Sequence, residues 1–327
     1  MPNLSKGFRI WLGRIAWGAA ALIVAAMVSG ALYQNVLLAR ERRAHPMPGE
    51  LIDVGGYRMH IHCTGRGTPP VILDSGLGDS YISWQNVQLE IAKFVQVCSY
   101  DRAGMGYSEP SPRRRTSRVF AEELHRLLHG AGIAPPYVLV GHSMAGYNVR
   151  LYADLYRSEM AGMVLVDGSH PDQLKRFPPA LHAMDANWIR QAKFLEFTAP
   201  IGIPRLFGYC GNDAALRAAE CTFNDAHENA AERETFRESA DEAKATGNLG
   251  QLPLVVISHD PDQRHPDVPD ALDKATNKAW EQMQEELSRL STRSTQLIAK
   301  RSGHYIQNDR PDIVIEAVHN IVDETRQ

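Results

Sequence analysis

The chain has 327 residues, of which 44% are hydrophobic and 22% are charged, as in ordinary globular proteins. This length allows one large domain or two average ones, and either can bury a sizeable core. The 35 basic and 38 acidic side chains nearly cancel, so the net charge of −3 gives no reason to expect nucleic acid as a partner. Four cysteines are too few for a disulfide scaffold, and Pro and Gly are too scattered for a disordered or collagen-like chain.

An uncharged stretch covers residues 15–39 and follows a basic segment, residues 1–14. As a helix it would be about 37 Å long, and the hydrocarbon core of a bilayer is about 30 Å thick. Trp17 and Tyr33 lie near its two ends, where interfacial aromatic residues anchor membrane helices. We therefore expect a single transmembrane helix at 15–39, joined to the rest of the chain by a linker at 40–49.

A cleaved signal peptide is the alternative to a permanent anchor. Ser29 and Ala31 are small residues of the kind found at a cleavage site, but the apolar region would be unusually long for such a peptide. The orientation is poorly marked, because three basic residues precede the uncharged stretch and three follow it. We favour a main domain on the outer, periplasmic or extracellular, face, since four cysteines permit two disulfides in an oxidising compartment.

Strand and helix patterns alternate through the rest of the chain. Strand patterns, either apolar or alternating, occupy residues 51–54, 57–63, 69–76, 94–101, 136–143, 161–167, 253–260 and 295–300. Helical patterns lie between most of them, at 84–94, 116–129, 144–157 and 271–290, and a last helix starts at Pro311. Such alternation predicts a mostly parallel sheet with helices on both faces.

The segment 168–251 interrupts this alternation. Its pattern is mostly helical, with several Pro and Gly breaks. We interpret it as a helical cap over the carboxyl ends of the strands, where open α/β sheets bind ligands. Residues 50–167 and 252–327 then form the core.

The sharpest chemical signal is the run Gly141-His142-Ser143-Met144-Ala145, which joins a buried strand to a helix. A serine on such a strand-to-helix turn is exposed, and the amide that follows it lies at a helix N-terminus. Ala145 stands where Gly-x-Ser-x-Gly motifs carry their second glycine, and alanine is small enough for the close approach of strand and helix. Ser143 is therefore the expected nucleophile, in preference to a simple helix N-cap.

Two other segments end strands on the same side of the sheet. His304 follows the last strand and completes the chain order Ser…Asp…His that such a turn requires. The segment 74–79 (Asp-Ser-Gly-Leu-Gly-Asp) ends the third strand, and its glycines let the backbone turn an amide toward the nucleophile. The amides of Leu77 and Met144 are the expected oxyanion hole, although a plain glycine turn would read the same way.

With Asp101-Arg-Ala-Gly-Met-Gly-Tyr-Ser108 between them, these segments resemble the α/β-hydrolase superfamily from about Glu50 to the C-terminus. The chain is similar, more closely, to bacterial members with an N-terminal membrane segment. The resemblance implies an eight-stranded sheet, a helical cap after the sixth strand and a Ser-His-Asp triad. Many relatives carry His-Gly where this chain has Ser75-Gly76, so the hydrogen bonds that support this loop must come from elsewhere.

Three aspartates compete for the acid of the triad. The family usually places the acid after the seventh strand, and counting from Pro253 puts Asp262 at that position. Asp260 is two residues closer to the strand, and Asp167 ends the sixth strand, the position that some lipases use. We expect Asp262, with Asp260 and Asp167 as alternates. The acid would hold His304 in the tautomer that accepts the serine proton.

The resemblance also implies a pairing of the cysteines. The family's strand order makes the strands of Cys63 and Cys98 neighbours, which leaves Cys210 and Cys221 as a pair within the cap. The second pair is harder to form, because a helix from Asp213 to Cys221 would hold its ends about 12 Å apart. The chain near Cys210 must then fold back for a disulfide to close.

The sequence thus predicts a membrane-anchored serine hydrolase that cleaves a carboxylic ester or a related acyl bond through an acyl-enzyme. A serine nucleophile argues against the aspartate-dependent dehalogenases and epoxide hydrolases of the same fold. The expected partners are a small acyl substrate and the lipid bilayer, without nucleic acid, and no cofactor or metal is required. An acyltransferase on the same triad and a non-catalytic binding protein on the same fold are the alternatives.

Overall fold

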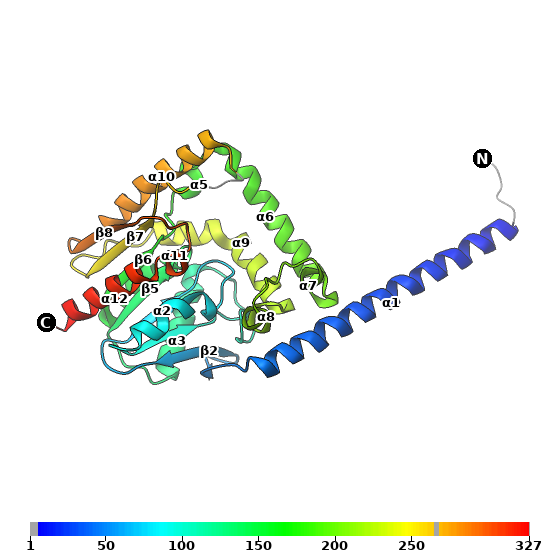
Figure 1. Cartoon of the computed structure of the whole chain (residues 1–327), viewed down its shortest axis with the longest axis horizontal. Coiled ribbons are helices and arrows are strands. Elements are labelled where there is room, and N and C mark those ends of the chain that lie inside the picture. Colours follow the sequence, from blue (N-terminus) through cyan, green and yellow to red (C-terminus); the bar gives the residue numbers. More distant parts are fainter. Residues whose placement is uncertain (1–5, 265–267, 327) are drawn as a thin grey trace.

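An eight-stranded sheet lies at the centre of the structure, a computed structural model that describes residues 6–264 and 268–326 (Figure 1). The strands are β1 (Glu50–Asp53), β2 (Arg58–Thr64), β3 (Val71–Asp74), β4 (Val97–Tyr100), β5 (Tyr137–His142), β6 (Met160–Val166), β7 (Leu254–His259) and β8 (Ser294–Ala299). Their order is β1-β2-β4-β3-β5-β6-β7-β8, and β2 runs in the direction opposite to the other seven strands. The eight predicted strands and the mostly parallel sheet are confirmed.

Helices cover both faces of the sheet because its central strands are apolar on both sides. Along β5, Tyr137 and Leu139 point into one hydrophobic core, and Val138 and Val140 point into the other. The helices α3 (Ser117–Gly130), α4 (Ala145–Leu155) and α10 (Asp270–Ser288) cover the first face, and α2 (Gln85–Ile91) and α12 (Pro311–Thr325) cover the second. This period-2 burial fixes the strand register. Because β3 to β8 run parallel to one another, their carboxyl ends all lie at one edge of the sheet.

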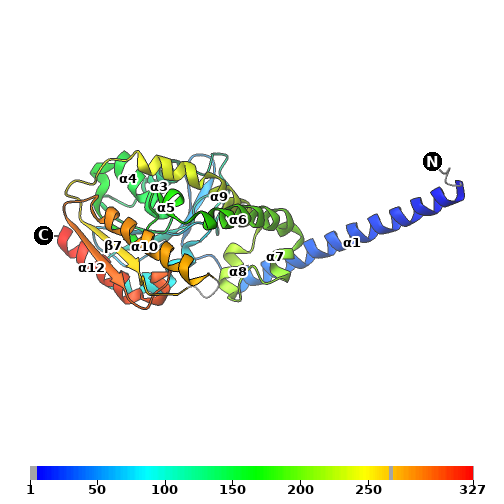
Figure 2. The same ribbon diagram turned by 90° about the horizontal axis from the view of Figure 1, so that it is seen from above.

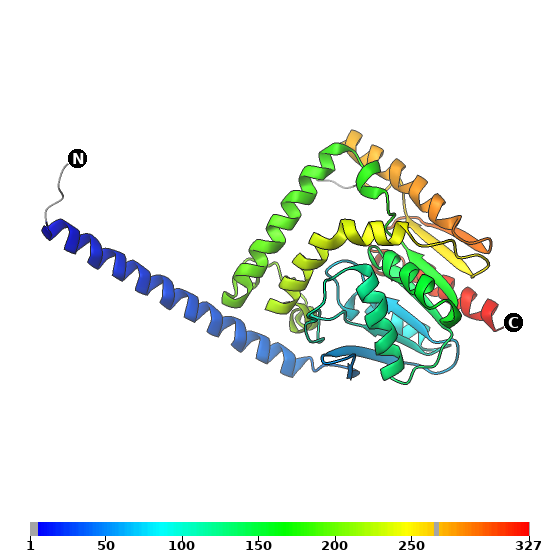
Figure 3. The ribbon, with the colours of Figure 1, turned by 180° about the vertical axis from the view of Figure 1, so that it is seen from behind.

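The connection from β6 to β7 is helical, and we call residues 168–251 the cap. It contains α5 (Gln173–Arg176), α6 (Pro179–Thr198), α7 (Ile203–Leu206), α8 (Ala214–Glu220) and α9 (Phe223–Lys244), with a 3₁₀ turn at Ala199–Ile201. Seen from behind, α9 lies between α6 and the core (Figure 3). The cap therefore reaches over the carboxyl ends of the strands, as the sequence predicts.

The N-terminal helix α1 (Lys6–Ala44) is long and apolar enough to cross a membrane and projects far from the rest of the molecule (Figure 1). Residues 1–5 of the expected basic segment lie outside the described residues. The prediction of a linker at 40–49 needs correction: the helix continues to Ala44, and the irregular link is limited to residues 45–49. The physical reason is that Arg40 to Ala44 are good helix formers and the first proline is Pro46.

The last third of α1 packs against the cap (Figure 2). Gly30 lies so close to the 3₁₀ turn that an added Cβ would be 2.3 Å from the carbonyl oxygen of Ile201. The Gln34 amide donates to the Cys221 carbonyl at 2.7 Å, and the Glu41 carboxylate accepts from the Arg205 guanidinium at 2.7 and 2.8 Å. The helix is therefore part of the cap's packing as well as a candidate anchor.

Both expected disulfides are present. Cys63 and Cys98 face each other directly on the antiparallel strands β2 and β4, with their Cα atoms 4.0 Å apart. Cys210 and Cys221 are bonded within the cap, with their Cα atoms 5.3 Å apart, because the chain before α8 folds back. The second bond ties the segment after α7 to the start of α9.

Candidate active site

Ser143 lies on the sharp turn between β5 and α4, with a positive φ of 54°. Its backbone N–H donates to the carbonyl of Val166 at 3.1 Å, which fastens the turn to β6. A Cβ at Gly141 would lie 2.8 Å from the carbonyl oxygen of Ala145, so only glycine fits there. The strained turn is held by the sheet and presents the serine side chain at the carboxyl end of the strands.

A continuous row of hydrogen-bonding groups runs from Ser143 through His304 to Asp167. The Ser143 Oγ atom is 2.9 Å from His304 Nε2, and His304 Nδ1 is 2.6 Å from Asp167 Oδ2. The His304 side chain is partly open to solvent, whereas that of Asp167 is fully buried. Two residues expected from the sequence thus meet, and one of the alternate acids completes the row.

The Asp167 carboxylate is enclosed by hydrogen-bond donors. It accepts from the His259 backbone N–H at 3.0 Å, from His259 Nδ1 at 2.8 Å and from the Trp280 indole N–H at 2.8 Å, besides His304. Burial alone would raise the pKa of Asp167, but His259 and His304 together hold that pKa well below its ordinary value. The group therefore stays ionised and presents a fixed negative charge to the His304 ring.

The structure does not place Asp262, the acid expected from the sequence, next to His304; Asp167 lies there instead. Its side chain is 86% exposed and pairs with the Lys300 ammonium at 3.2 Å, while Asp260 pairs with the same ammonium at 2.9 Å. Asp260 also accepts from the Arg301 backbone N–H at 2.8 Å, and this hydrogen bond, together with Lys300, lowers the pKa of Asp260 to about 2. Both carboxylates are thus turned toward the end of β8.

The physical reason is the register of β6 against β7. Val166 is level with Ile257, so the residue after β6 meets the end of β7, where the His259 N–H and ring donate to it. Sequence counting missed His259 and Trp280 as partners of the acid. The single local signal was Asp167-Gly168 directly after a buried strand, which is typical of a functional turn.

The amides expected to form the oxyanion hole lie on the two loops that flank the serine. Leu77 belongs to the loop after β3, and Met144 follows Ser143 at the start of α4. Over the described ranges, neither backbone N–H has a hydrogen-bond acceptor in the protein. Unpaired amide donors next to a nucleophile can stabilise a tetrahedral oxyanion, so the amides of Leu77 and Met144 stay the expected oxyanion hole.

A buried guanidinium supports the Ser75-Gly76 loop, in place of the histidine that many relatives carry. Arg102 donates to the carbonyls of Ser75 and Gly76, both at 2.7 Å, and forms a bidentate ion pair with Glu232 of α9 at 2.6 and 3.0 Å. The Glu232 carboxylate also accepts from the Gly78 N–H at 2.9 Å. The cap and the core therefore fix the loop between them.

His142, the residue before the nucleophile, is hydrogen-bonded to the backbone of His304. Burial lowers the pKa of His142 to about 3, so its ring is neutral, and its Nε2 atom lies 3.0 Å from the His304 carbonyl oxygen, to which it donates. Its other ring nitrogen lies 3.9 Å from Asp79 Oδ2, and neither atom has a hydrogen-bond partner in the described part of the chain. Both atoms lie close to Gly76, in the segment 74–79 that we call the oxyanion loop.

One group of side chains outside the site has the spacing of metal ligands. His125 and His129 of α3 face Glu159, with candidate ligand atoms within 4.8 Å of one another. Glu159 precedes β6 and Asp167 follows it, so the group lies at the opposite end of the sheet from the serine. Its polar atoms already pair with one another and with the Tyr152 hydroxyl.

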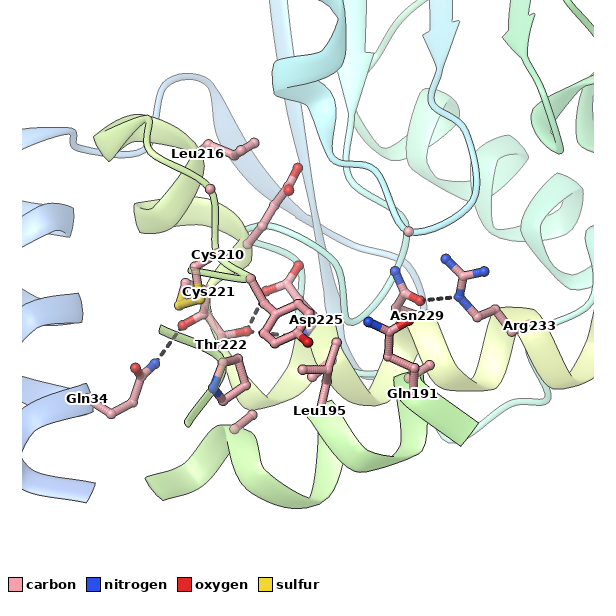
Figure 4. Close-up of a pocket in the computed structure, with 18 of the residues that line it drawn as sticks. Gln34, Gln191, Leu195, Cys210, Leu216, Cys221, Thr222, Asp225, Asn229 and Arg233 are labelled. Carbon is pink, nitrogen blue, oxygen red and sulfur yellow. Dashed lines mark hydrogen bonds between the residues drawn. A yellow bond between two sulfur atoms is a disulfide. The ribbon is translucent and has the colours of Figure 1, made fainter. Parts of the chain in front are cut away.

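A cavity of about 420 Å³ lies beside the site, within the cap (Figure 4). Gln34 reaches it from α1 at one side, and Asn229 and Arg233 of α9 border it at the other. Gly78, which follows Leu77, also lines it. The cavity therefore extends from the N-terminal helix to the oxyanion loop.

Comparisons with known proteins agree with this architecture. A family model described as the alpha/beta hydrolase fold matches residues 69–311. The uncharacterized protein YqjL of Bacillus subtilis is 24% identical over 272 residues, which are 82% of this chain and 89% of that protein.

Solved structures extend the likeness. A thermophilic esterase from Thermogutta terrifontis is 21% identical, with a TM-score of 0.61 over 85% of this chain and 99% of its own. The epoxide hydrolase CorEH is 17% identical, with a TM-score of 0.59 over 83% of this chain and 97% of its own. Since these neighbours carry out different reactions, they inform the fold and leave the reaction to the site.

Proposed function

Because the chain belongs to the α/β-hydrolase fold family, we propose that it is a serine hydrolase that cleaves a carboxylic ester or a related acyl bond. The row Ser143–His304–Asp167 is the observation that carries the proposal. A serine in this place also argues for an acyl-enzyme and against epoxide chemistry, which uses a carboxylate nucleophile in this fold.

In the first half of the reaction, Ser143 Oγ attacks the acyl carbonyl carbon, and its proton passes to His304 Nε2, 2.9 Å away. The new C–O bond makes the carbonyl oxygen an oxyanion, which the Leu77 and Met144 amides stabilise. The imidazolium formed on His304 is stabilised by the buried Asp167 charge. Collapse of the intermediate breaks the ester C–O bond, and the alcohol leaves with the proton from His304.

Water completes the cycle. His304, neutral again, removes a proton from a water molecule as the oxygen attacks the acyl-enzyme carbonyl. The same amides stabilise the second oxyanion, and the proton returns to Ser143 Oγ as the carboxylic acid leaves. Asp167 keeps its charge throughout, because His259 and Trp280 donate to it in addition to His304.

The anchoring of the enzyme is part of the proposal. Residues 15–39 of α1 supply the uncharged stretch that a single membrane span requires, and the side chains before residue 30 are exposed almost without exception. The two disulfides support a position of the catalytic domain on the outer, oxidising face of the membrane. Carbonate extraction of native membranes tests the span: the full chain stays with the pellet, whereas a cleaved protein appears in the supernatant.

A panel of esters with acyl chains of increasing length tests the chemistry. The wild-type full chain in detergent releases acid and alcohol in equal amounts, and Ser143→Ala abolishes turnover while its circular dichroism is unchanged. A folded Ser143→Ala protein that keeps wild-type activity contradicts the proposal. Transfer of the acyl group to an added alcohol in preference to water would identify an acyltransferase instead.

A further inference from the structure

Exposed apolar side chains gather on one part of the main domain. Six of them belong to the end of the cap that adjoins α1, and we call them the cap tip: Phe194, Phe197, Leu206, Phe207, Tyr209 and Phe223. Elsewhere outside α1, the described residues expose large apolar side chains only at Leu89, Trp188, Ile298 and Tyr305. Single exposed apolar residues are ordinary, but a concentration of phenylalanines on one end of a domain indicates an apolar partner.

The position of the cap along α1 identifies this partner. The 3₁₀ turn before α7 touches α1 at Gly30, and Gly202 lies against Gln34. Gly30 lies inside the uncharged stretch 15–39, nine residues before its end, which corresponds to about 13 Å along a helix. The contact with the cap thus begins before the uncharged stretch has ended.

This geometry leaves little room for water between the cap and a bilayer. The uncharged residues before Gly30 reach only about 22 Å as a helix, less than the bilayer core of about 30 Å. The 3₁₀ turn that touches Gly30, and α7 after it, must therefore lie at the membrane surface or within it (Figure 2). The cap tip is then continuous with the lipid-facing surface of α1. Tyr209 is of the residue type that favours the interface between headgroups and hydrocarbon.

The cavity of the cap lies directly behind the tip. Its lining includes Gln34 of α1, Leu195 of α6 and Pro204 of α7, together with Asn229 of α9 and Gly78 of the oxyanion loop. Trp188, half exposed, also borders it. A ligand that enters between α1 and the cap can therefore reach Gly78, next to the amide of Leu77, through this cavity.

We propose that the cap tip is seated in the lipid bilayer beside α1 and that the cavity receives its acyl substrate from the membrane. The proposal rests on the anchored serine hydrolase proposed above and names its substrate class: acyl esters that partition into lipid. The occupant of the cap tip is the bilayer itself, because the tip continues the apolar surface of the membrane helix.

Depth measurement tests the seating without any assay of activity. The full chain carrying Phe207→Cys, labelled with an environment-sensitive fluorophore, is reconstituted into vesicles of phosphatidylcholine and phosphatidylglycerol. We expect doxyl-labelled lipids to quench the fluorophore and iodide in the buffer to quench it weakly. Leu89→Cys is the matched control, since Leu89 is an exposed leucine (66%) on α2, away from the cap, and its label should respond to iodide alone. Equal responses of the two labels overturn the proposal.

Turnover tests the route of the substrate. In vesicles, the Phe197→Glu/Phe207→Glu variant should lower the ratio of long-chain ester hydrolysis to acetyl ester hydrolysis at least tenfold, and Leu89→Glu should leave this ratio at the wild-type value. An unchanged ratio in the double variant overturns the proposed route. Absence of hydrolysis of either ester by the wild type instead removes the proposed function, while the fluorescence result still decides where the cap tip lies.

Discussion

The carboxyl end of the sheet and the cap both bury carboxyl groups, but the cap also exposes a group of apolar side chains. At the end of the sheet, a charged group is deeply buried, and each oxygen of Asp167 has a donor. The cap has an apolar outer tip and an acidic inner side, where Asp225, Glu228 and Glu232 are buried against the core. The end of the sheet therefore holds a fixed charge next to the reacting groups, whereas the cap presents an apolar surface that fits the lipid bilayer proposed above.

The largest effect should follow from removal of the nucleophile or its base. Ser143→Ala and His304→Ala should each lower kcat by about 10⁴- to 10⁶-fold, and the double variant should cost little more, because the two residues act as one unit. Steady-state kinetics on a short-chain ester measure this. Effects that multiply in the double variant would mean that the two residues act independently.

Exchange of the acid comes next. Asp167→Asn should reduce kcat by about 10⁴-fold, because the amide cannot hold the His304 tautomer and presents a donor to His259 and Trp280. Asp262→Asn is the matched control, since its carboxylate is exposed and pairs with the Lys300 ammonium. If Asp262→Asn loses activity while Asp167→Asn stays active, then Asp262, in the loop after β7, is the acid of the triad.

The junction of α1 and the cap should affect stability more than chemistry. Glu41→Gln leaves the buried Arg205 guanidinium with a weakened partner and should cost about 3 kcal/mol of unfolding free energy. Glu90→Gln, which removes an exposed pair with Lys93, should cost less than about 1 kcal/mol. Thermal unfolding of the full chain in nanodiscs compares the two, and equal shifts would show that α1 and the cap are not coupled.

The smallest effect concerns pH. Burial, with the Asp79 carboxyl acting in the same direction, raises the pKa of Glu220 to about 8 from an ordinary value of 4.5. Between these values the folded protein holds a proton that the unfolded chain has released, so this group lowers stability as the pH rises through that window. Glu220→Gln should therefore match the wild type at about pH 4.5 and exceed it by roughly 1 to 3 kcal/mol at pH 8. A difference in Tm that does not grow with pH would contradict this.

The sequence allowed Ser143 and His304 to be located because each follows a buried strand in a short, characteristic run. Asp167 could be given only as an alternate, because the choice depends on the register of β6 against β7 and on Trp280, more than a hundred residues away. The path of α1 shows the same limit. An uncharged stretch predicts a membrane helix, but it does not reveal that Gln34 and Glu41 bond to cap residues far along the chain.

Site-resolved labelling tests the central claim, that Ser143 is the nucleophile of a hydrolase, most directly. The full chain in detergent is treated with a fluorophosphonate probe, digested and examined by mass spectrometry. We expect one phosphonyl adduct on the peptide that contains Ser143, and its loss in Ser143→Ala and in His304→Ala. A folded wild-type protein that takes up no probe, or takes it up at another serine, would show that Ser143 is not the nucleophile.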